Sequence, residues 1–275
     1  MSAPSGFQLR GSAPEAYQRY GVAAIGAAKA QELVALAALQ PGERELDVAC
    51  GTGVVARQAA QAVGTTGQVI GLDVNDGMLR VARTVAPPVG APITWRDGSV
   101  MALPFPDATF DVVLCQWGLE FFPDRAQGLR EMARVLVPDG RLGLRVWRAL
   151  ERQPFQMAVL AALDRHLFGG QDVPSRAALV QPFTLADAEE LRAFVADAGF
   201  RDIHVRIMTL PIRFASVEAY TLGFLSATPI ASEVAAMEET ARTRMIQDIA
   251  AALHTFVDDE GLAAPAEDHL VLARK

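Results

Sequence analysis

One short segment, Leu46–Gly53, limits what this chain can fold into more than any other feature. It reads L-D-V-A-C-G-T-G, an apolar run of strand type that enters a Gly-x-Gly turn, and a helical pattern begins directly after it at Val54. Two glycines allow the backbone to pass close to a ligand, and the start of the helix offers free N–H groups to a carboxylate or phosphate. The segment therefore predicts an α/β fold with a ligand at this turn.

Strand-like and helical runs alternate on the C-terminal side of this turn. The expected strands lie at 43–49, 68–73, 93–96, 110–116, 141–147, 202–210 and 269–273, and the expected helices of the first half lie at 54–62, 76–85 and 125–137. Such alternation is typical of crossover connections in a parallel sheet with both faces covered. We therefore predict a Rossmann-like, doubly wound α/β sheet of seven strands, mostly parallel with an antiparallel C-terminal strand.

The segments outside this core have a different character. Residues 1–14 are rich in Ser, Pro and Gly and predict a flexible tail, whereas 15–275 are expected to form a single domain with a ligand-binding core at 15–147. An Ala-rich helix is expected at 14–39. The apolar segments 151–182 and 213–262 open no new crossover unit, so we expect them to form a helical cap or lid.

Charge and composition narrow the class of ligand. The 32 acidic residues exceed the 25 Lys and Arg, giving a net charge of -7, and no basic run is present. Apolar stretches fall well short of the roughly 18 residues that a membrane span needs. Cys50 and Cys115 lie at the ends of apolar runs and suggest neither a disulfide framework nor a metal site. We expect a cytoplasmic protein that binds a small molecule, with no nucleic acid, no membrane span and no metal.

An acidic residue suggests what the turn binds. Asp73 ends the second expected strand, 20 residues after Gly53, where a carboxylate can accept hydrogen bonds from both hydroxyls of a ribose. The spacing of Gly51, Gly53 and Ala56 also fits the dinucleotide-binding pattern. These residues therefore favour an adenosine-containing ligand and leave open whether it is a nicotinamide cofactor or S-adenosylmethionine.

Further motifs follow in a fixed order and decide between these cofactors. They are Asp97-Gly98-Ser99 after the third strand, Leu103-Pro104-Phe105 before the fourth, Phe110–Val113 within it, and Glu131–Leu142 across the next helix and turn. Together with Leu46–Gly53, this series resembles the UbiE/type 11 family of small-molecule methyltransferases over about 43–147. Ala49 stands where that family usually has its first glycine.

The resemblance implies S-adenosyl-L-methionine as the cofactor and gives roles by position. The implied contacts are Gly51 and Gly53 under the methionine moiety, Asp73 at the ribose, Asp97 and Gly98 at the adenine, and Asp47 supporting the turn near the amino group. Gln116 and Trp117 would border both cofactor and substrate. The other expected cofactor contacts are Tyr17, on a helix that closes the site in this family, and Ala49, Val74 and Ser99.

Methyl transfer needs an aligned nucleophile about 3 Å from the methyl carbon more than it needs a base. If a base is used, His166 in the expected cap and Glu120 after the fourth strand are the candidates. The alternative for both residues is a solvated or structural role, which is the more common one for a histidine on an amphipathic helix.

We therefore expect an S-adenosylmethionine-dependent methyltransferase that acts by in-line displacement on a small, hydrophobic or aromatic acceptor, such as a quinone-like molecule or a secondary metabolite, with S-adenosylhomocysteine as product. Two alternatives are an NAD(P)-dependent oxidoreductase, for which the chain has no Tyr-x-x-x-Lys motif, and a protein that binds S-adenosylmethionine without transferring its methyl. The apolar helical stripe at 216–257 fits a lid, ordinary helix packing or the face of a homodimer.

Overall fold

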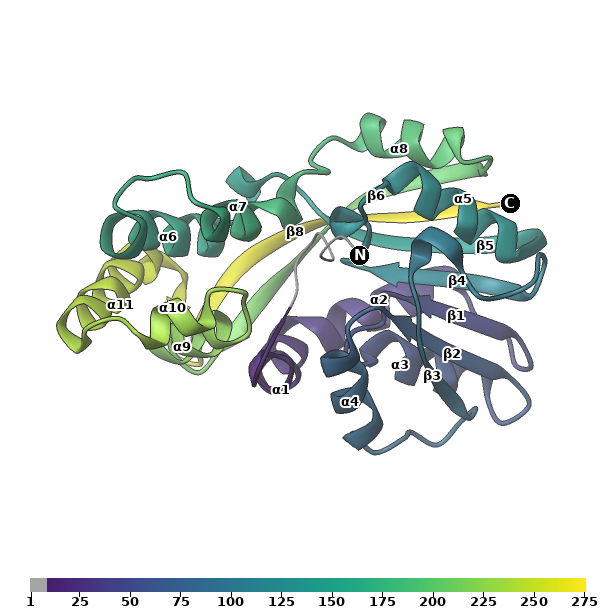
Figure 1. The fold of residues 1–275 in the computed structure, drawn as a ribbon, viewed down its shortest axis with the longest axis horizontal. Coiled ribbons are helices and arrows are strands. Elements are labelled where there is room, and N and C mark those ends of the chain that lie inside the picture. Colours follow the sequence, from purple (N-terminus) through teal and green to yellow (C-terminus); the bar gives the residue numbers. More distant parts are fainter. Residues whose placement is uncertain (1–8) are drawn as a thin grey trace.

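A twisted sheet runs through the whole molecule, as the computed structural model of residues 9–275 shows (Figure 1). Its strand order is β3-β2-β1-β4-β5-β8-β6, with β7 paired to β8. The strands are β1 (Arg44–Val48), β2 (Gln68–Asp73), β3 (Ile93–Asp97), β4 (Phe110–Gln116), β5 (Leu136–Trp147), β6 (Arg201–Phe214), β7 (Val257–Asp258) and β8 (Gly261–Arg274).

The first five strands pair in parallel, and β8 is antiparallel to both β5 and β6. The predicted Rossmann-like, mostly parallel sheet with an antiparallel C-terminal strand is confirmed. The expected number of seven strands differs by one, because the two-residue β7 forms a hairpin with the start of β8.

Both faces of the sheet are covered by helices, which explains why its strands are apolar on both sides. Helices α2 (Ala27–Ala37) and α3 (Val54–Val63) pack on one face, against alternate residues of β4 such as Val112 and Leu114. Helices α5 (Arg125–Val135) and α8 (Ala188–Asp197) pack on the other, against Val113 and Cys115. Helix α4 (Asp76–Thr84) lies beside β2 and β3, and the side chain of Asn75 caps its start.

The N-terminal helix has nearly the expected bounds but is less regular than expected. It consists of α1 (Ala13–Ala16), a π-helical stretch η1 (Tyr17–Gly26) and α2 in one continuous run. The flexible tail predicted at 1–14 is wrong for 9–14, since Leu9 is buried and its carbonyl accepts a hydrogen bond of 3.1 Å from Asn75 Nδ2. The remainder of that predicted tail, 1–8, lies outside the described residues.

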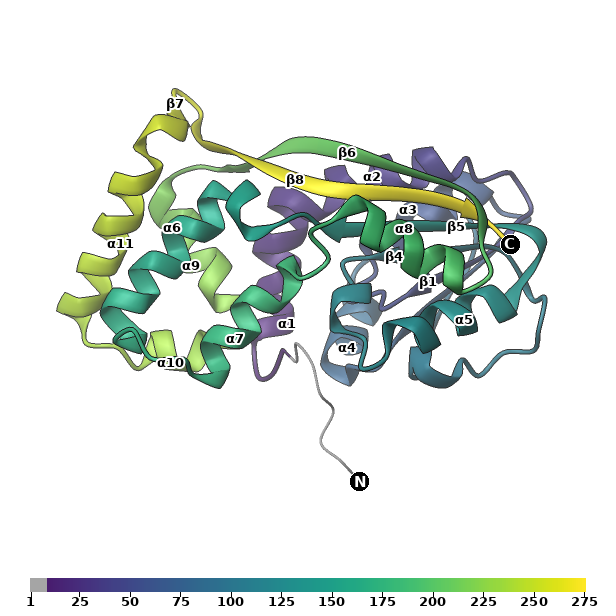
Figure 2. The same cartoon turned by 90° about the horizontal axis from the view of Figure 1, so that it is seen from above.

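A helical cap stands on the extended ends of β6 and β8 (Figure 2). It contains α6 (Pro154–Leu163), the π-helical η5 (Asp164–Phe168), α7 (Pro174–Val180), α9 (Val217–Ser226), α10 (Ala231–Ala235) and α11 (Glu239–Leu253). The short 3-10 helices of the chain are η2 (Val100–Ala102), η3 (Leu119–Phe121), η4 (Leu150–Arg152), η6 (Gln181–Phe183) and η7 (His254–Phe256). The cap helices share a hydrophobic core with Leu262, Ala264 and Ala266 of β8. Strand β8 therefore starts eight residues before the predicted position of 269 and joins the cap to the sheet.

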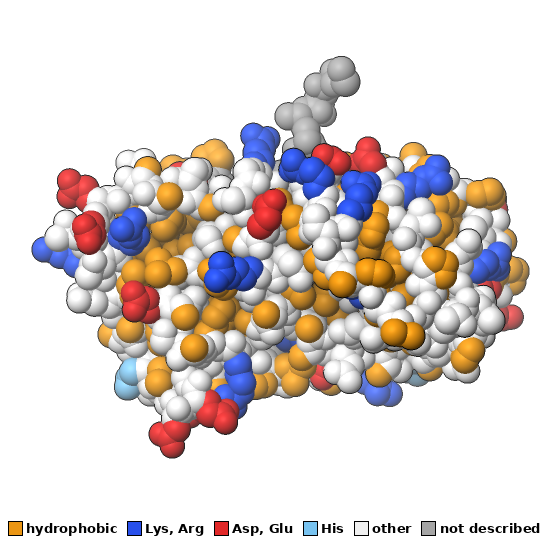
Figure 3. Space-filling model, turned by 90° about the horizontal axis from the view of Figure 1, so that it is seen from below, with side chains coloured by type: hydrophobic (Ala, Val, Ile, Leu, Met, Phe, Trp, Pro, Cys, Tyr) orange, Lys and Arg blue, Asp and Glu red, His pale blue; other side chains and the backbone are white. Residues whose placement is uncertain are grey.

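The surface carries charges of both signs. On the face shown in Figure 3, acidic and basic side chains are interspersed among hydrophobic ones. Within residues 9–275, no helix combines the length and the apolarity that crossing a bilayer requires.

Candidate functional site

A cavity of about 480 Å³ lies between the carboxyl ends of the parallel strands and the cap. One part of its lining, here called the turn side, comes from 47–51, 54–55, 72–75, 78 and 98–100. The opposite part, the cap side, comes from 147, 155–156, 179–183, 214 and 224–228. Residues 116–118, at the end of β4, lie between the two. This is the edge of an open α/β sheet where ligands are expected.

On the turn side, two buried carboxylates hold the glycine turn in place. Asp47 Oδ2 accepts a hydrogen bond of 2.9 Å from the Ala56 N–H in the first turn of α3. Asp73 Oδ2 accepts one of 2.7 Å from the Gly51 N–H, and its Oδ1 accepts one of 2.8 Å from the Asn75 N–H. Burial raises the pKa of Asp47 to about 8 and also raises the pKa of Asp73, whose backbone hydrogen bonds oppose the shift.

The two glycines of the turn serve different purposes. Gly51 has a φ of +55°, and a Cβ there would meet nothing closer than Tyr17 Cε1 at 4.0 Å, so it would project into open space. Gly53 has a φ of +84°, and a Cβ there would lie 2.1 Å from the Trp95 ring. Gly53 does not line the cavity and packs against Trp95, and its expected contact with the methionine moiety stays a prediction.

Ala49, the departure from the usual glycine, occupies a left-handed conformation with a φ of +56°. Such a conformation is uncommon for a residue with a side chain. The Ala49 methyl group leaves no room opposite it, because a Cβ on Gly118 would lie 2.7 Å from the Ala49 Cβ. Gly118 therefore has to be a glycine.

The structure brings most of the expected cofactor contacts together around this cavity. The residues that line it are Tyr17, Asp47, Ala49, Gly51, Asp73, Val74, Gly98, Ser99, Gln116 and Trp117. Asp97 does not line it, because its side chain is exposed at the end of β3. Tyr17 projects from the π-helical η1, and burial together with the nearby Asp73 and Asp47 raises its pKa to about 12.

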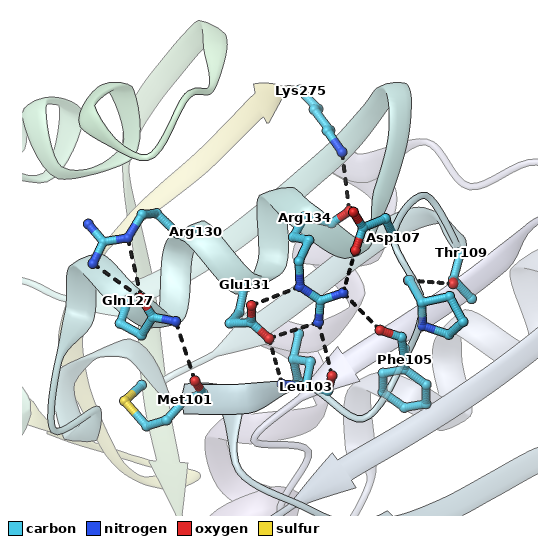
Figure 4. Close-up of polar contacts among 11 residues, drawn as sticks. Met101, Leu103, Phe105, Asp107, Thr109, Gln127, Arg130, Glu131, Arg134 and Lys275 are labelled. Carbon is cyan, nitrogen blue, oxygen red and sulfur yellow. Dashed lines mark hydrogen bonds and ion pairs between the residues drawn. The ribbon is translucent and has the colours of Figure 1, made fainter.

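The loop behind the turn side is held by one arginine (Figure 4). Arg134 on α5 donates hydrogen bonds of 2.9 Å to the carbonyls of Leu103 and Phe105 and forms ion pairs with Asp107 and Glu131. Glu131 Oε2 in turn accepts the Leu103 N–H at 2.7 Å. These contacts fix the loop that follows Gly98–Val100, which gives Glu131 and Arg134 of the Glu131–Leu142 motif a structural role.

The cap side is aromatic. Trp117 and Trp147 stack with ring centroids 4.6 Å apart and planes within 7° of parallel, and Trp147 also contacts the rings of Phe155 and Phe183. The polar side chains here are few: Thr228 donates to the Leu225 carbonyl, and Gln156 Nε2 donates to the Leu179 carbonyl at 3.4 Å. The sequence did not predict Trp147, Phe155, Gln156 or Phe183 as site residues, because they come from β5, α6 and η6 and form no local motif.

Neither expected base lines the cavity. The His166 ring lies 2.8 Å from Asp248 Oδ2, on the cap and away from the lining. Glu120 is buried behind the lining, where its Oε1 accepts the Trp147 N–H at 2.9 Å and its Oε2 has no partner among the described residues. Burial raises the pKa of Glu120 to about 8. Its position indicates a structural role rather than contact with a substrate.

Comparisons with known proteins show which family the chain resembles. A family model described as a methyltransferase domain matches 46–144. The ubiquinone/menaquinone biosynthesis C-methyltransferase UbiE of Ectopseudomonas mendocina is 34% identical over 189 residues, 64% of this chain and 72% of that protein. The demethylmenaquinone methyltransferase of Symbiobacterium thermophilum is 43% identical over 113 residues, which cover 40% of this chain and 45% of that one.

Solved structures give the same fold. The YcgJ protein of Bacillus subtilis superposes with a TM-score of 0.56 at 20% identity and covers 90% of this chain and 98% of that one. Phosphoethanolamine N-methyltransferase 2 of Haemonchus contortus, in complex with S-adenosylhomocysteine, superposes with a TM-score of 0.54 at 20% identity. This match covers 90% of this chain and 52% of that one.

The residues of the turn side fit the cofactor of such enzymes. A buried carboxylate at Asp73 matches a ribose, and the open space over Gly51 admits a ligand close to the backbone. Gln116 has a buried amide oxygen without a partner among the described residues, where a ligand group could donate. The chain therefore belongs to the UbiE-like family of S-adenosylmethionine-dependent methyltransferases.

Proposed function

We propose that this enzyme transfers the methyl group of S-adenosylmethionine to a small, flat, apolar acceptor of quinone-like type, which binds on the cap side. The observation that carries this proposal is a single cavity with carboxylates at one end and stacked aromatic rings at the other. Aromatic side chains favour flat ring systems through stacking and edge contacts. The relatives named above act on quinone precursors according to their names, which supports the same acceptor class.

On the turn side, we assign each residue a role in holding the cofactor. Asp73 accepts the ribose hydroxyls, Gly51 lies under the methionine moiety, and Asp47 keeps the start of α3 in place. Gly98 and Ser99 border the adenine. Asp97 is exposed, so a contribution from it would come through the outer edge of the adenine.

The protein promotes the reaction by positioning the acceptor rather than by transferring a proton. When bound, the cofactor supplies a methyl group on a sulfonium, which is a good electrophile. Among the described residues that line the cap side, none has a titratable side chain, and Gln156 and Thr228 are polar but neutral. Holding a nucleophile in line at about 3 Å is itself a large part of the rate enhancement. The acceptor must therefore be nucleophilic without a base from this side.

The fold alone does not establish turnover. SpnF, a [4+2]-cyclase, has a similar fold, with a TM-score of 0.50 at 20% identity. A binding protein would retain S-adenosylmethionine, whereas a methyltransferase produces S-adenosylhomocysteine once an acceptor is added.

The proposal also covers the domain organisation of the protein, its location in the cell and its partners. We assign 15–275 to one domain, with 15–147 as the cofactor-binding core and 151–182 and 213–262 as the cap. We also propose that the protein is cytoplasmic. The net charge of -7 and the mixed charges of Figure 3 support the absence of a nucleic acid partner. A homodimer through the cap stays a prediction, which light scattering on the purified protein would test.

Calorimetric titration with S-adenosylmethionine, S-adenosylhomocysteine and NADH tests the cofactor. We expect the first two to bind and NADH not to bind. A turnover assay with a short-chain naphthohydroquinone then tests the acceptor class, read as S-adenosylhomocysteine formed. Cofactor binding without turnover of any ring-hydroxylated acceptor would contradict the proposed acceptor, and preference for NADH would contradict the whole assignment.

A further inference from the structure

Two tryptophans of the cavity wall are held in an unusual arrangement. Trp117 follows β4 directly and has a φ of +55°, in the left-handed region that bulky residues rarely adopt. Its indole ring lies almost parallel to that of Trp147, at 4.6 Å. A backbone conformation of this kind persists only where the surrounding structure enforces it. Neighbouring contacts must therefore hold Trp117 in this conformation.

The restraint on Trp117 comes from the C-terminal strand. The Trp117 backbone N–H donates to the Arg145 carbonyl at 2.8 Å, and its indole Nε1 donates to Asp268 Oδ1 at 3.2 Å. Asp268 is fully buried on β8 and lies directly opposite Trp147 in the antiparallel register. One carboxylate thus neighbours both tryptophans, although it does not line the cavity.

A buried set of charges keeps this carboxylate in place. Its other oxygen, Oδ2, accepts hydrogen bonds from Lys29 Nζ and from Arg145 Nη1, the latter at 2.9 Å. Arg145 also pairs with Glu32, so the set holds two cations and two carboxylates. Lys29 Nζ lies 5.2 Å from the centre of the Trp147 ring, within the range of a cation–π contact. The same ion pair therefore contacts both rings of the stack.

We infer that Asp268, supported by Lys29, is a positioning residue that sets the plane of the Trp117–Trp147 pair, against which a flat acceptor packs. This inference rests on the proposed function for its acceptor. It extends the site to α2 and β8, outside the segment 46–144 that matches the methyltransferase domain. The charged residues themselves touch neither cofactor nor acceptor, since none of them lines the cavity.

A double-mutant cycle tests this inference. Asp268→Asn removes the charge that binds Lys29, and Trp117→Phe keeps a ring but removes the indole N–H. Each is expected to raise the KM for a naphthohydroquinone about tenfold, with a small change in kcat and unchanged affinity for S-adenosylhomocysteine. Because both variants act through the same contact, the double variant should be little worse than either single one. Tyr220→Phe is the control: it removes a buried hydroxyl that has no partner among the described residues and does not line the cavity.

A second readout needs no acceptor. The near-ultraviolet circular dichroism of the stacked indoles should change in Asp268→Asn and stay unchanged in Tyr220→Phe. If Asp268→Asn does not fold because Lys29 loses its carboxylate and Arg145 keeps only Glu32, the paired variant Lys29→Met/Asp268→Asn replaces it in the cycle. If wild-type enzyme does not methylate the hydroquinone, the proposed acceptor fails, while the dichroism still decides the positioning role. Unchanged indole bands, additive effects on KM, or an equal loss of S-adenosylhomocysteine affinity would overturn the inference.

Discussion

The two sides of the cavity are built in different ways. The turn side comes from three consecutive strand ends, and its geometry depends on backbone N–H groups held by Asp47 and Asp73. The cap side comes from helices and long strands scattered between 147 and 228, and its lining is largely side-chain rings. If the cofactor and the acceptor bind as proposed, a contiguous motif holds the cofactor, whereas packing between distant segments selects the acceptor. Substitutions should separate accordingly, changing cofactor affinity on one side and acceptor KM on the other.

The largest effect is expected at Asp73. Asp73→Ala removes the acceptor of the Gly51 N–H and the proposed partner of the ribose. Hydrogen bonds to a charged group are worth about 1.5–3 kcal/mol, so S-adenosylmethionine should bind about 100-fold more weakly by calorimetry. Asp259→Ala is the control, because that carboxylate is exposed in the turn between β7 and β8 and does not line the cavity. Equal losses in the two variants, or none in Asp73→Ala, would remove the ribose role.

Substitutions at the two glycines of the turn should have different effects, one mainly on stability and the other mainly on ligand binding. Gly53→Ala places a methyl group against the Trp95 ring and should lower the free energy of unfolding by about 2–3 kcal/mol. Gly51→Ala meets open space and should cost only about 1–2 kcal/mol for its left-handed conformation, but should weaken S-adenosylmethionine binding at least about tenfold. Urea unfolding and calorimetry on both variants measure the two effects. A Gly51→Ala protein with wild-type affinity would show that the cofactor does not approach this turn.

The turn side and the cap side also differ in how far the sequence could predict them. The core at 43–147 was predictable because apolar runs, glycine stops and helical periodicity agree along it. The role of Gly53 was not, since a glycine required by a ligand and one required by Trp95 look the same in a sequence. The segment 9–14 has a composition typical of disorder, but Leu9 is buried and its carbonyl accepts a hydrogen bond from Asn75.

The cap side was harder to predict for a different reason. The first half of β8 is rich in Ala and contains Pro265, which gives little strand propensity, and its pairing with β6 forms over a long sequence separation. The rings of Trp147, Phe155 and Phe183 meet only after that pairing has placed the cap. His166 looked like a base because nothing in the sequence shows that Asp248 is its neighbour.

A smaller effect, confined to the acceptor, is expected at Gln156. Its amide nitrogen faces the Leu179 carbonyl, which leaves Oε1 buried and without a partner among the described residues. We expect an acceptor hydroxyl to donate to this oxygen. Gln156→Leu should raise the KM for a naphthohydroquinone about fivefold, because it removes one hydrogen bond of about 1 kcal/mol. Its affinity for S-adenosylhomocysteine should not change, and an unchanged KM would show that Gln156 does not contact the acceptor.

The smallest effect on catalysis is expected at Glu120, where stability should change instead. Its pKa rises from 4.5 to about 8 on folding, so between these values the unfolded chain loses a proton that the folded protein keeps. The free energy of unfolding therefore falls as pH rises from about 4.5 to about 8 and is constant above, as far as this group is concerned.

Glu120→Gln keeps an oxygen for the Trp147 N–H and removes this titration. We expect its melting temperature to equal that of wild type near the ordinary pKa of 4.5 and to exceed it by about 2–4 °C for each kcal/mol regained near pH 8. Asp47, whose pKa is also about 8, titrates in both proteins and cancels from the difference. Turnover should change less than about twofold, whereas loss of a general base would lower it by roughly 10²–10⁴. A loss of that size would show that Glu120 acts as a general base, and it would contradict the proposal that the cap side positions the acceptor without proton transfer.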